Sequence, residues 1–334
     1  MRRNKIPPKG FERIERNGKL KMSLPSAQTD IATQATCDDA ASCKRYAVQK
    51  GYWSDIHINY MVSGSMQKRQ PEISRGYYAR TEKIWNLISQ FVSLTNNLCQ
   101  IVSFGAGLDT TFWRLHSAGL LPTRYIEVDF QEIVYRKIRA IRNKSPLKGC
   151  LGSITSSDQS SLHCEKYHLV TCDLRDTGSL KDKLKSSEVD FSVPTLFLTE
   201  CVLVYIPPED SMAILKWCAE SFTDAVFVNY EQVRMHDNFG QVMIQNLKAR
   251  DCLLTGVHPC ASLDSQIQRF TSAGWPCVSC DDMWTIYNSL PDRRRIERIE
   301  LLDESELLQQ LMEHYCLCVA VKDVSDIGLT DLHT

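Results

Sequence analysis

The chain has no long apolar run and almost no net charge. None of its 334 residues falls in a stretch approaching the roughly 20 apolar residues that a membrane-spanning helix needs. Its 39 basic and 40 acidic residues leave a formal charge of −1, so nothing attracts it generally to nucleic acid or to an anionic membrane. The basic residues 1–8 precede no apolar segment and do not form a signal peptide. We therefore expect a cytoplasmic protein, a monomer, with no nucleic-acid or membrane partner.

A regular zinc-binding pattern is also missing, although cysteine is abundant. Of the 14 cysteines, Cys277 and Cys280 form one close pair and Cys316 and Cys318 another, with an irregular gap between the pairs. Others, such as Cys172, lie inside apolar runs, where a free thiol behaves as a small hydrophobic side chain. We expect reduced thiols and no metal site.

The composition is that of an ordinary globular protein, with 43% hydrophobic and 24% charged residues and neither internal repeats nor low-complexity tracts. Residues 1–36 are polar and are interpreted as a flexible tail without chemistry. The next segment, 37–98, predicts a helical cap with helices over Ala41–Gly51 and Tyr77–Leu94. The remainder, 99–334, is interpreted as one α/β domain.

From residue 100 onward, short apolar runs alternate with helical stretches, of which 130–142 and 208–222 are the clearest. Such alternation predicts a doubly wound, mostly parallel sheet. Near the end, extended segments at 276–280 and 316–321 predict a closing antiparallel hairpin. This arrangement, with an N-terminal helical cap, would suit the Rossmann-like α/β fold of methyltransferases that use S-adenosylmethionine (SAM). The expected parallel strands are Gln100–Phe104, Tyr125–Asp129, Tyr167–Cys172, Thr195–Thr199 and Ala225–Tyr230.

A glycine-containing turn follows the first expected strand. Gly105 and Gly107 are separated by one residue, and Asp109 and Thr110 then open a helix whose free N–H groups would face a ligand. A dinucleotide fingerprint needs a third glycine at the position of Thr110. A loop with two glycines and an early acid, here Asp109, therefore fits SAM better than a dinucleotide, but a simple tight strand-to-helix turn explains the same residues.

Carboxylates follow three of the expected strands, where ligands of such sheets bind. Asp129 lies 24 positions after Gly105, near the spacing at which an acid binds ribose hydroxyls; the alternative is a cap on the helix 130–142. Asp173 suits an adenine amine, with the Leu174 backbone at the ring edge, or else it caps the next helix. Glu200 ends an apolar strand, where an unpartnered acid is costly to bury, which favours a site role.

Taken together, eight runs in order resemble the leucine carboxyl methyltransferase family over essentially the whole chain after residue 36. The similarity is to the eukaryotic members of that family. The matching runs are Cys43–Val48, Gly51–Trp53, Pro71–Arg80, Phe104–Trp113, Tyr125–Asp129, Asp173–Asp176, Glu200–Tyr205 and Asn229–Gln232.

The resemblance implies site residues that spacing alone does not give. It implies that Arg80 contacts SAM, and the planar guanidinium suits the carboxylate of the methionine moiety. Taken without the resemblance, Arg80 is interpreted as a solvated charge on a helix. Tyr205 is implied to lie near the methyl acceptor, so Arg80 and Tyr205 are the candidate catalytic residues. The implied cofactor contacts are Lys44, Arg80, Gly105, Asp129, Asp173, Leu174 and Glu200.

The implied reaction is methylation of the C-terminal leucine carboxylate of the protein phosphatase 2A catalytic subunit. Three alternatives remain. Related enzymes act in wybutosine synthesis on transfer RNA, but they carry a large repeat domain for which we expect no room in residues 290–334. Bacterial relatives methylate small molecules. The chain is also compatible with a non-catalytic phosphatase-binding protein that retains the pocket as a relic.

Overall fold

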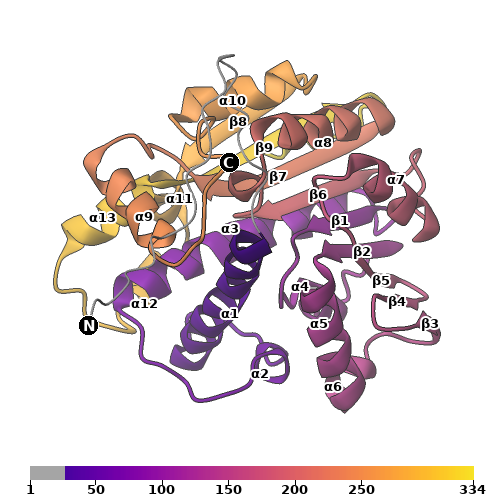
Figure 1. The fold of residues 1–334 in the computed structure, drawn as a ribbon, viewed down its shortest axis with the longest axis horizontal. Coiled ribbons are helices and arrows are strands. Elements are labelled where there is room, and N and C mark those ends of the chain that lie inside the picture. Colours follow the sequence, from indigo (N-terminus) through magenta and orange to yellow (C-terminus); the bar gives the residue numbers. More distant parts are fainter. Residues whose placement is uncertain (1–26) are drawn as a thin grey trace, which may run out of the picture.

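The computed structural model describes residues 27–334 and is built on one nine-stranded sheet (Figure 1). Its strand order is β3-β4-β5-β2-β1-β6-β7-β9-β8. The strands are β1 (Gln100–Phe104), β2 (Arg124–Asp129), β3 (Ile154–Ser157), β4 (Ser161–Cys164), β5 (Tyr167–Thr171), β6 (Thr195–Glu200), β7 (Asp224–Gln232), β8 (Cys277–Asp282) and β9 (Tyr315–Asp323).

The centre of the sheet is parallel and both of its ends are antiparallel. Strands β5, β2, β1, β6 and β7 run parallel, whereas β9 is antiparallel to both β7 and β8. The predicted fold class, a doubly wound α/β sheet with a closing antiparallel pair, is confirmed. The β3–β4 hairpin was not predicted, because its serine-rich strands are largely exposed and show no apolar alternation.

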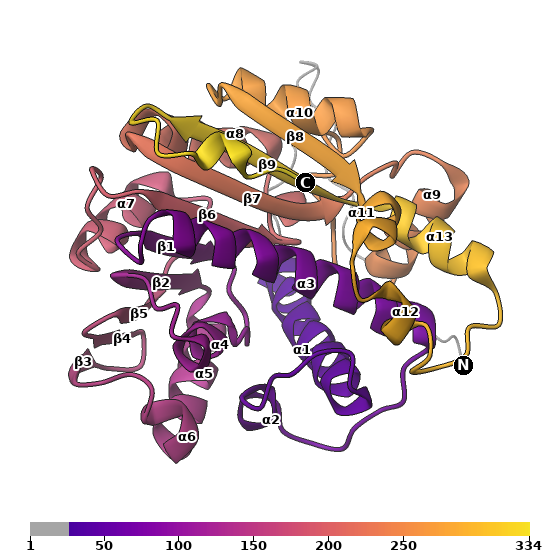
Figure 2. The same cartoon turned by 180° about the vertical axis from the view of Figure 1, so that it is seen from behind.

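Helices cover both faces of the sheet because each central strand is apolar on both sides. Ile101 belongs to the hydrophobic cluster that includes residues of α3, α4 and α5, whereas Val102 belongs to the cluster formed with α7, α8 and α10. Figure 2 shows α3 lying along the sheet on one side, with α8 and α10 beyond the strands. These helices are α3 (Pro71–Leu94), α4 (Thr111–Ala118), α5 (Gln131–Asn143), α7 (Thr177–Ser186), α8 (Pro208–Ser221) and α10 (Leu263–Ser272).

The N-terminal cap begins earlier than the sequence suggested. Helix α1 spans Ala27–Lys50 and packs against α2 (Ile58–Met61) and α3. The predicted tail boundary at residue 36 is therefore wrong, whereas the rest of that prediction, for residues 1–26, lies outside the described residues. The first turns of α1 are polar and show no apolar periodicity, because they cover a cavity rather than a hydrophobic core.

Of the remaining helices, α6 (Ser145–Lys148) packs against α5, whereas α11 (Met283–Ser289) and α13 (Ser305–Glu313) of the C-terminal half pack against α3 (Figure 1). All 14 cysteines are unpaired thiols. Among residues 27–334, no helix has the length and apolar character required to cross a membrane. The remaining helices are α6 (Ser145–Lys148), α9 (Asn238–Lys248), α11 (Met283–Ser289), α12 (Arg293–Ile296) and α13 (Ser305–Glu313), with short 3₁₀ turns at Leu203–Tyr205 and Leu329–Asp331.

Candidate active site

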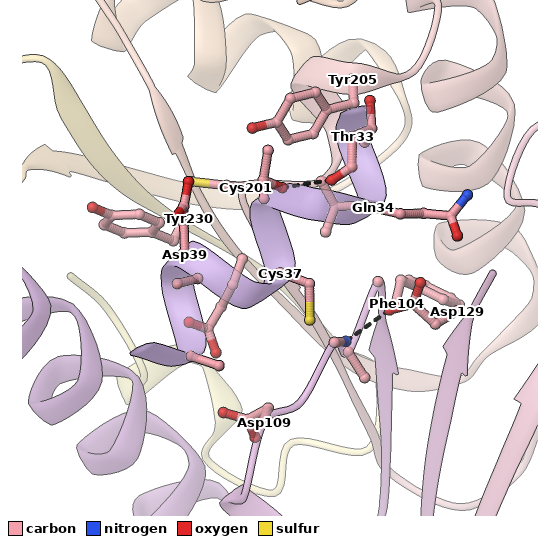
Figure 3. A pocket seen from close by; sticks show the side chains of 18 of the residues that line it. Thr33, Gln34, Cys37, Asp39, Phe104, Asp109, Asp129, Cys201, Tyr205 and Tyr230 are labelled. Carbon is pink, nitrogen blue, oxygen red and sulfur yellow. Dashed lines mark hydrogen bonds between the residues drawn. The ribbon is translucent and has the colours of Figure 1, made fainter. Parts of the chain in front are cut away.

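A cavity of about 350 Å³ lies at the carboxyl ends of β1, β2, β5, β6 and β7. Helix α1 forms one of its walls, and Figure 3 shows Thr33 and Cys37 of that helix facing the same space as Asp129 and Tyr205. Its volume is in the range usual for small-molecule sites. Every residue predicted to bind the cofactor or to take part in catalysis lines this cavity: Lys44, Arg80, Gly105, Asp129, Asp173, Leu174, Glu200 and Tyr205.

The loop after β1 depends on glycine at two positions. Gly105 has φ +60°, and a Cβ atom there would lie 2.6 Å from Cγ2 of Val202. Gly107 has φ +55°, and its Cβ would lie 3.1 Å from the Cys37 sulfur on α1. Both positions therefore require a left-handed backbone and close packing, which only glycine accommodates without strain.

Asp129, the last residue of β2, holds this loop in place. Its Oδ2 accepts the backbone N–H of Gly107 at 2.7 Å, and its Oδ1 accepts the N–H of Phe130 at 2.7 Å. Burial raises the pKa of the carboxyl, and the two backbone N–H groups partly oppose that shift. The cap position of α5 is Phe130 rather than Asp129, so the capping alternative is not observed. The ribose contact stays a prediction.

Four charged side chains, each largely but not fully buried, form a chain of ion pairs along one side of the cavity. Lys44 Nζ lies 3.0 Å from Asp109 Oδ2 and 3.2 Å from Glu200 Oε2, and Arg80 Nε donates to the same Glu200 oxygen at 2.6 Å. Nη2 of Arg80 also donates to the Glu200 backbone carbonyl at 3.3 Å. Two cations thus face two carboxylates, and we refer to Lys44, Arg80, Asp109 and Glu200 as the charge quartet.

The quartet keeps all four groups ionised despite burial. For Glu200, burial opposes ionisation, but Lys44 and Arg80 outweigh it and lower the pKa. Asp109 behaves in the same way beside Lys44, and its pKa also falls. The pKa of Lys44 is raised, because Glu200 and Asp109 more than compensate for the cost of burying the ammonium. The cavity therefore offers fixed charges of both signs, which suits a zwitterionic ligand group.

Arg80 is held by aromatic rings as well as by Glu200. Its guanidinium carbon lies 4.4 Å from the centre of the Tyr230 ring and 5.6 Å from that of Tyr77. The side chain is 10% exposed, so its interpretation without the family resemblance, a solvated charge on a helix, is wrong. No hydrogen bond joins Nη1 of Arg80 to any residue within 27–334, which leaves this nitrogen able to donate to a ligand.

Asp173 and Leu174 line the opposite part of the cavity. Both carboxylate oxygens of Asp173 accept hydrogen bonds from Arg175, whose guanidinium also pairs with Asp30 of α1. Helix α7 is capped by Asp176 instead, through the Ser179 N–H, so the capping alternative for Asp173 is wrong. The adenine contact of Asp173 and Leu174 stays a prediction.

Tyr205 ends the short 3₁₀ turn after β6 and borders the cavity beside Thr33 of α1 (Figure 3). Its backbone carbonyl accepts a hydrogen bond from the Thr255 hydroxyl at 2.6 Å, which fixes the turn. Burial raises the pKa of the Tyr205 hydroxyl well above its usual value. At neutral pH this side chain is therefore a neutral hydrogen-bond donor, not a base.

Several lining residues were missed by sequence reasoning. Asp109 was recognised as an early acid of the glycine loop that favours SAM, but its ion pair with Lys44 was not expected. Thr33 and Cys37 fell in or beside the presumed tail. Tyr230 and Tyr315 lie in β7 and β9, and their rings stack 5.4 Å apart at the cavity wall, which no local pattern indicates.

Comparison with known proteins identifies the family. The family model described as leucine carboxyl methyltransferase matches residues 32–219. Leucine carboxyl methyltransferase 1 of Bos taurus is 46% identical over 317 residues, covering 93% of this chain and 96% of that protein. The chain belongs to the leucine carboxyl methyltransferase family. Within this family, the leucine carboxyl methyltransferase 1 homolog of Arabidopsis thaliana is 39% identical over 315 residues, covering 91% of this chain and 95% of the homolog.

A second kind of relative is longer than this chain. The tRNA wybutosine-synthesizing protein 4 of Homo sapiens is 34% identical over 301 residues, which are 86% of this chain but only 44% of that protein. Among solved structures, the plantazolicin methyltransferase BpumL in complex with SAH (S-adenosylhomocysteine) is 11% identical, with a TM-score of 0.41 and coverage of 87% of this chain and 99% of that one.

Proposed function

We propose that this protein transfers the methyl group of SAM to the C-terminal leucine α-carboxylate of the protein phosphatase 2A catalytic subunit and forms a methyl ester. The observation that carries the proposal is the charge quartet, which lies in one cavity with the glycine loop and Asp129 in a chain of this family. We also propose that the protein works as a cytoplasmic monomer.

The residues that line the cavity fit SAM. The nucleoside end needs a close backbone approach and an acid for the ribose, which Gly105 and Asp129 provide. The adenine needs an apolar edge, and Leu174 lines the cavity near Asp173. The methionine end carries an ammonium and a carboxylate, which match the opposite charges of Glu200 and Arg80. Lys44 lies between Glu200 and Asp109, and we propose that it completes the contact with this end.

When bound, SAM supplies a methyl group on a positively charged sulfur. The acceptor needs no general base, because an α-carboxyl group has a pKa of about 3.5 and is already an anion at neutral pH. Catalysis then rests on alignment of the acceptor with the methyl group and on exclusion of water from the anion. Arg80 would orient the methionine carboxylate, and the neutral hydroxyl of Tyr205 would donate a hydrogen bond near the acceptor.

Asp129→Asn should weaken SAM binding by about 1–3 kcal/mol, the usual contribution of a hydrogen bond to a charged group. Asp129 accepts backbone N–H groups through both oxygens, whereas the asparagine amide has one acceptor and would direct its NH₂ group at an N–H. Isothermal titration calorimetry with SAM measures the difference. Affinity equal to that of the unmodified protein would remove Asp129 from the ribose role.

The chemical class of the product provides the test of the proposed reaction. Labelled methyl groups transferred from SAM to the phosphatase should be released as methanol by mild alkali, because esters hydrolyse there and N-methyl amines do not. The rate should also not rise tenfold per unit between about pH 6 and 8, as it would for a lysine acceptor with a reference pKa near 10.4. Alkali-stable label with such a pH dependence would show that an amine is the acceptor.

A further inference from the structure

A buried lysine lies beneath the glycine loop, outside the cavity. Lys137 of α5 has a fully buried side chain, and its Nζ donates to the backbone carbonyl of Asp109 at 2.8 Å. The same Nζ lies 2.5 Å from Oε2 of Glu127, on β2, and 5.6 Å from the centre of the Trp113 ring. Lys137 does not line the cavity, so it does not belong to the site described above.

The partner of this lysine is equally buried. Glu127 is 0% exposed, and its Oε2 also accepts a hydrogen bond from the Tyr167 hydroxyl at 2.7 Å. Its other oxygen has no hydrogen-bond partner within the described part of the chain. Burial raises the pKa of Glu127 even though Lys137 opposes the shift. The fold therefore accommodates a charged pair in an aromatic environment at a considerable solvation cost.

A buried ion pair is an inefficient means of stabilising a fold, since apolar side chains of similar volume often do as well or better. This pair offers something that apolar side chains do not, namely a cationic donor for the Asp109 carbonyl. The carboxylate of the same residue binds Lys44, and Lys44 binds Glu200 in the cavity. Lys137 thus contacts the backbone of Asp109, whose side chain belongs to the charge quartet.

The β2–α5 unit consequently holds the loop at two points. Asp129 accepts the Gly107 N–H at 2.7 Å, and Lys137 donates to the Asp109 carbonyl two residues later. Figure 3 shows Asp129 and Asp109 at opposite sides of the loop region that faces the cavity. Glu127 and Asp129 are two positions apart on one strand, so both project from the same face of β2, toward α5.

We propose that Lys137, held by Glu127, is a positioning residue for cofactor binding. It fixes the Asp109 carbonyl and so places the Asp109 carboxylate, which sets the position of Lys44 and Glu200. Lys137 itself touches neither the cofactor nor the acceptor. The proposal rests on the proposed function in naming SAM as the cofactor, but the anchoring of the loop is a property of the protein alone.

The test replaces both Lys137 and Glu127, so that neither buried charge is left without its partner. Lys137→Met alone would leave the buried Glu127 without its cation and is expected to destabilise the fold. The Glu127→Gln/Lys137→Met double variant avoids this problem and retains an acceptor for Tyr167. A matched control is Glu231→Gln/Arg269→Met, which removes another buried pair, 2.7 Å apart between β7 and α10, that does not contact the loop.

Three measurements are made on each protein. Calorimetry gives the dissociation constants of SAM and S-adenosylhomocysteine, hydrogen exchange without ligand follows the backbone N–H groups of residues 105–111, and steady-state kinetics give the KM for the acceptor. We expect the 127/137 variant to bind both ligands about tenfold more weakly, the loss of one hydrogen bond from a charged donor. We also expect its loop N–H groups to exchange faster and its KM for the acceptor to stay unchanged. The control should match the unmodified protein in all three.

Equal ligand affinity in the 127/137 variant and the control would overturn the proposal, as would unchanged exchange of the loop. Failure of the proposed function gives a different result. In that case the unmodified protein would not bind SAM, while the exchange experiment would still decide whether Lys137 anchors the loop.

Discussion

Arg80→Met is expected to lower kcat/KM by about a hundredfold while the protein remains folded, because the loss of a charge-assisted contact of up to about 3 kcal/mol corresponds to roughly that factor. Arg80 donates to Glu200 and stacks on Tyr230 at the cavity wall. Glu200 keeps Lys44 at 3.2 Å in the variant, so no buried carboxylate is left without a cation. Steady-state kinetics and thermal unfolding together measure the two effects.

Arg75→Met is the matched control on the same helix. Arg75 is buried, but its guanidinium donates to the backbone carbonyls of Glu297 and Glu300. These hydrogen bonds join α3 to the segment after α12, away from the cavity. This variant should unfold at a lower temperature and bind SAM normally. If Arg80→Met loses stability as strongly as Arg75→Met and retains its affinity for SAM, Arg80 is structural and its role at the methionine end is wrong.

Gly105→Ala should abolish detectable SAM binding and lower the free energy of unfolding by about 2–4 kcal/mol, since it combines left-handed backbone strain with overpacking. The added Cβ would lie 2.6 Å from Val202, directly after the strand that carries Glu200. The loop therefore has to move, and with it the N–H group of Gly107 that Asp129 accepts. Calorimetry and urea unfolding measure the two losses.

Gly119→Ala is the control that separates the effect of backbone strain from the effect of packing against Val202. Gly119 also has a positive φ, +71°, but a Cβ there meets no atom within 4 Å. It lies at the end of α4, distant from the loop in sequence but in the same strand–loop–helix unit. We expect a stability loss of about 1 kcal/mol and normal SAM affinity. Equal losses of affinity in the two variants would show that backbone strain alone, not the packing of the loop against Val202, determines binding.

The central strands were predictable from the sequence because their physical signal is local. β1 was predicted with its observed bounds, since burial on both faces requires a continuous apolar run between a polar helix end and a glycine turn. β3 and β4 gave no such signal, because an exposed antiparallel hairpin needs little apolar surface. The first turns of α1 were missed because they also bury little apolar surface, since they line a cavity.

In the candidate site, too, some features had a local sequence signal and others depended on contacts between distant parts of the chain. Glu200 was expected to need a partner, because an acid at the end of an apolar strand cannot be buried alone. Its partners could not be identified from the sequence, because Lys44 and Arg80 lie 156 and 120 residues before it in the chain. They reach Glu200 only because α1 and α3 pack against the strand ends. The family resemblance supplied these two residues. The structure adds the ion pair of Asp109 with Lys44 and the buried Lys137, which neither spacing nor resemblance had indicated.

The central claim is that the methyl group goes to the carboxylate of a C-terminal leucine. The most direct test incubates this protein and labelled SAM with the folded protein phosphatase 2A catalytic subunit, either complete or lacking only its terminal leucine. The account predicts label on the complete subunit, released by mild alkali, and none on the truncated one. Equal labelling of both subunits would contradict it, because the proposed acceptor is absent from the second.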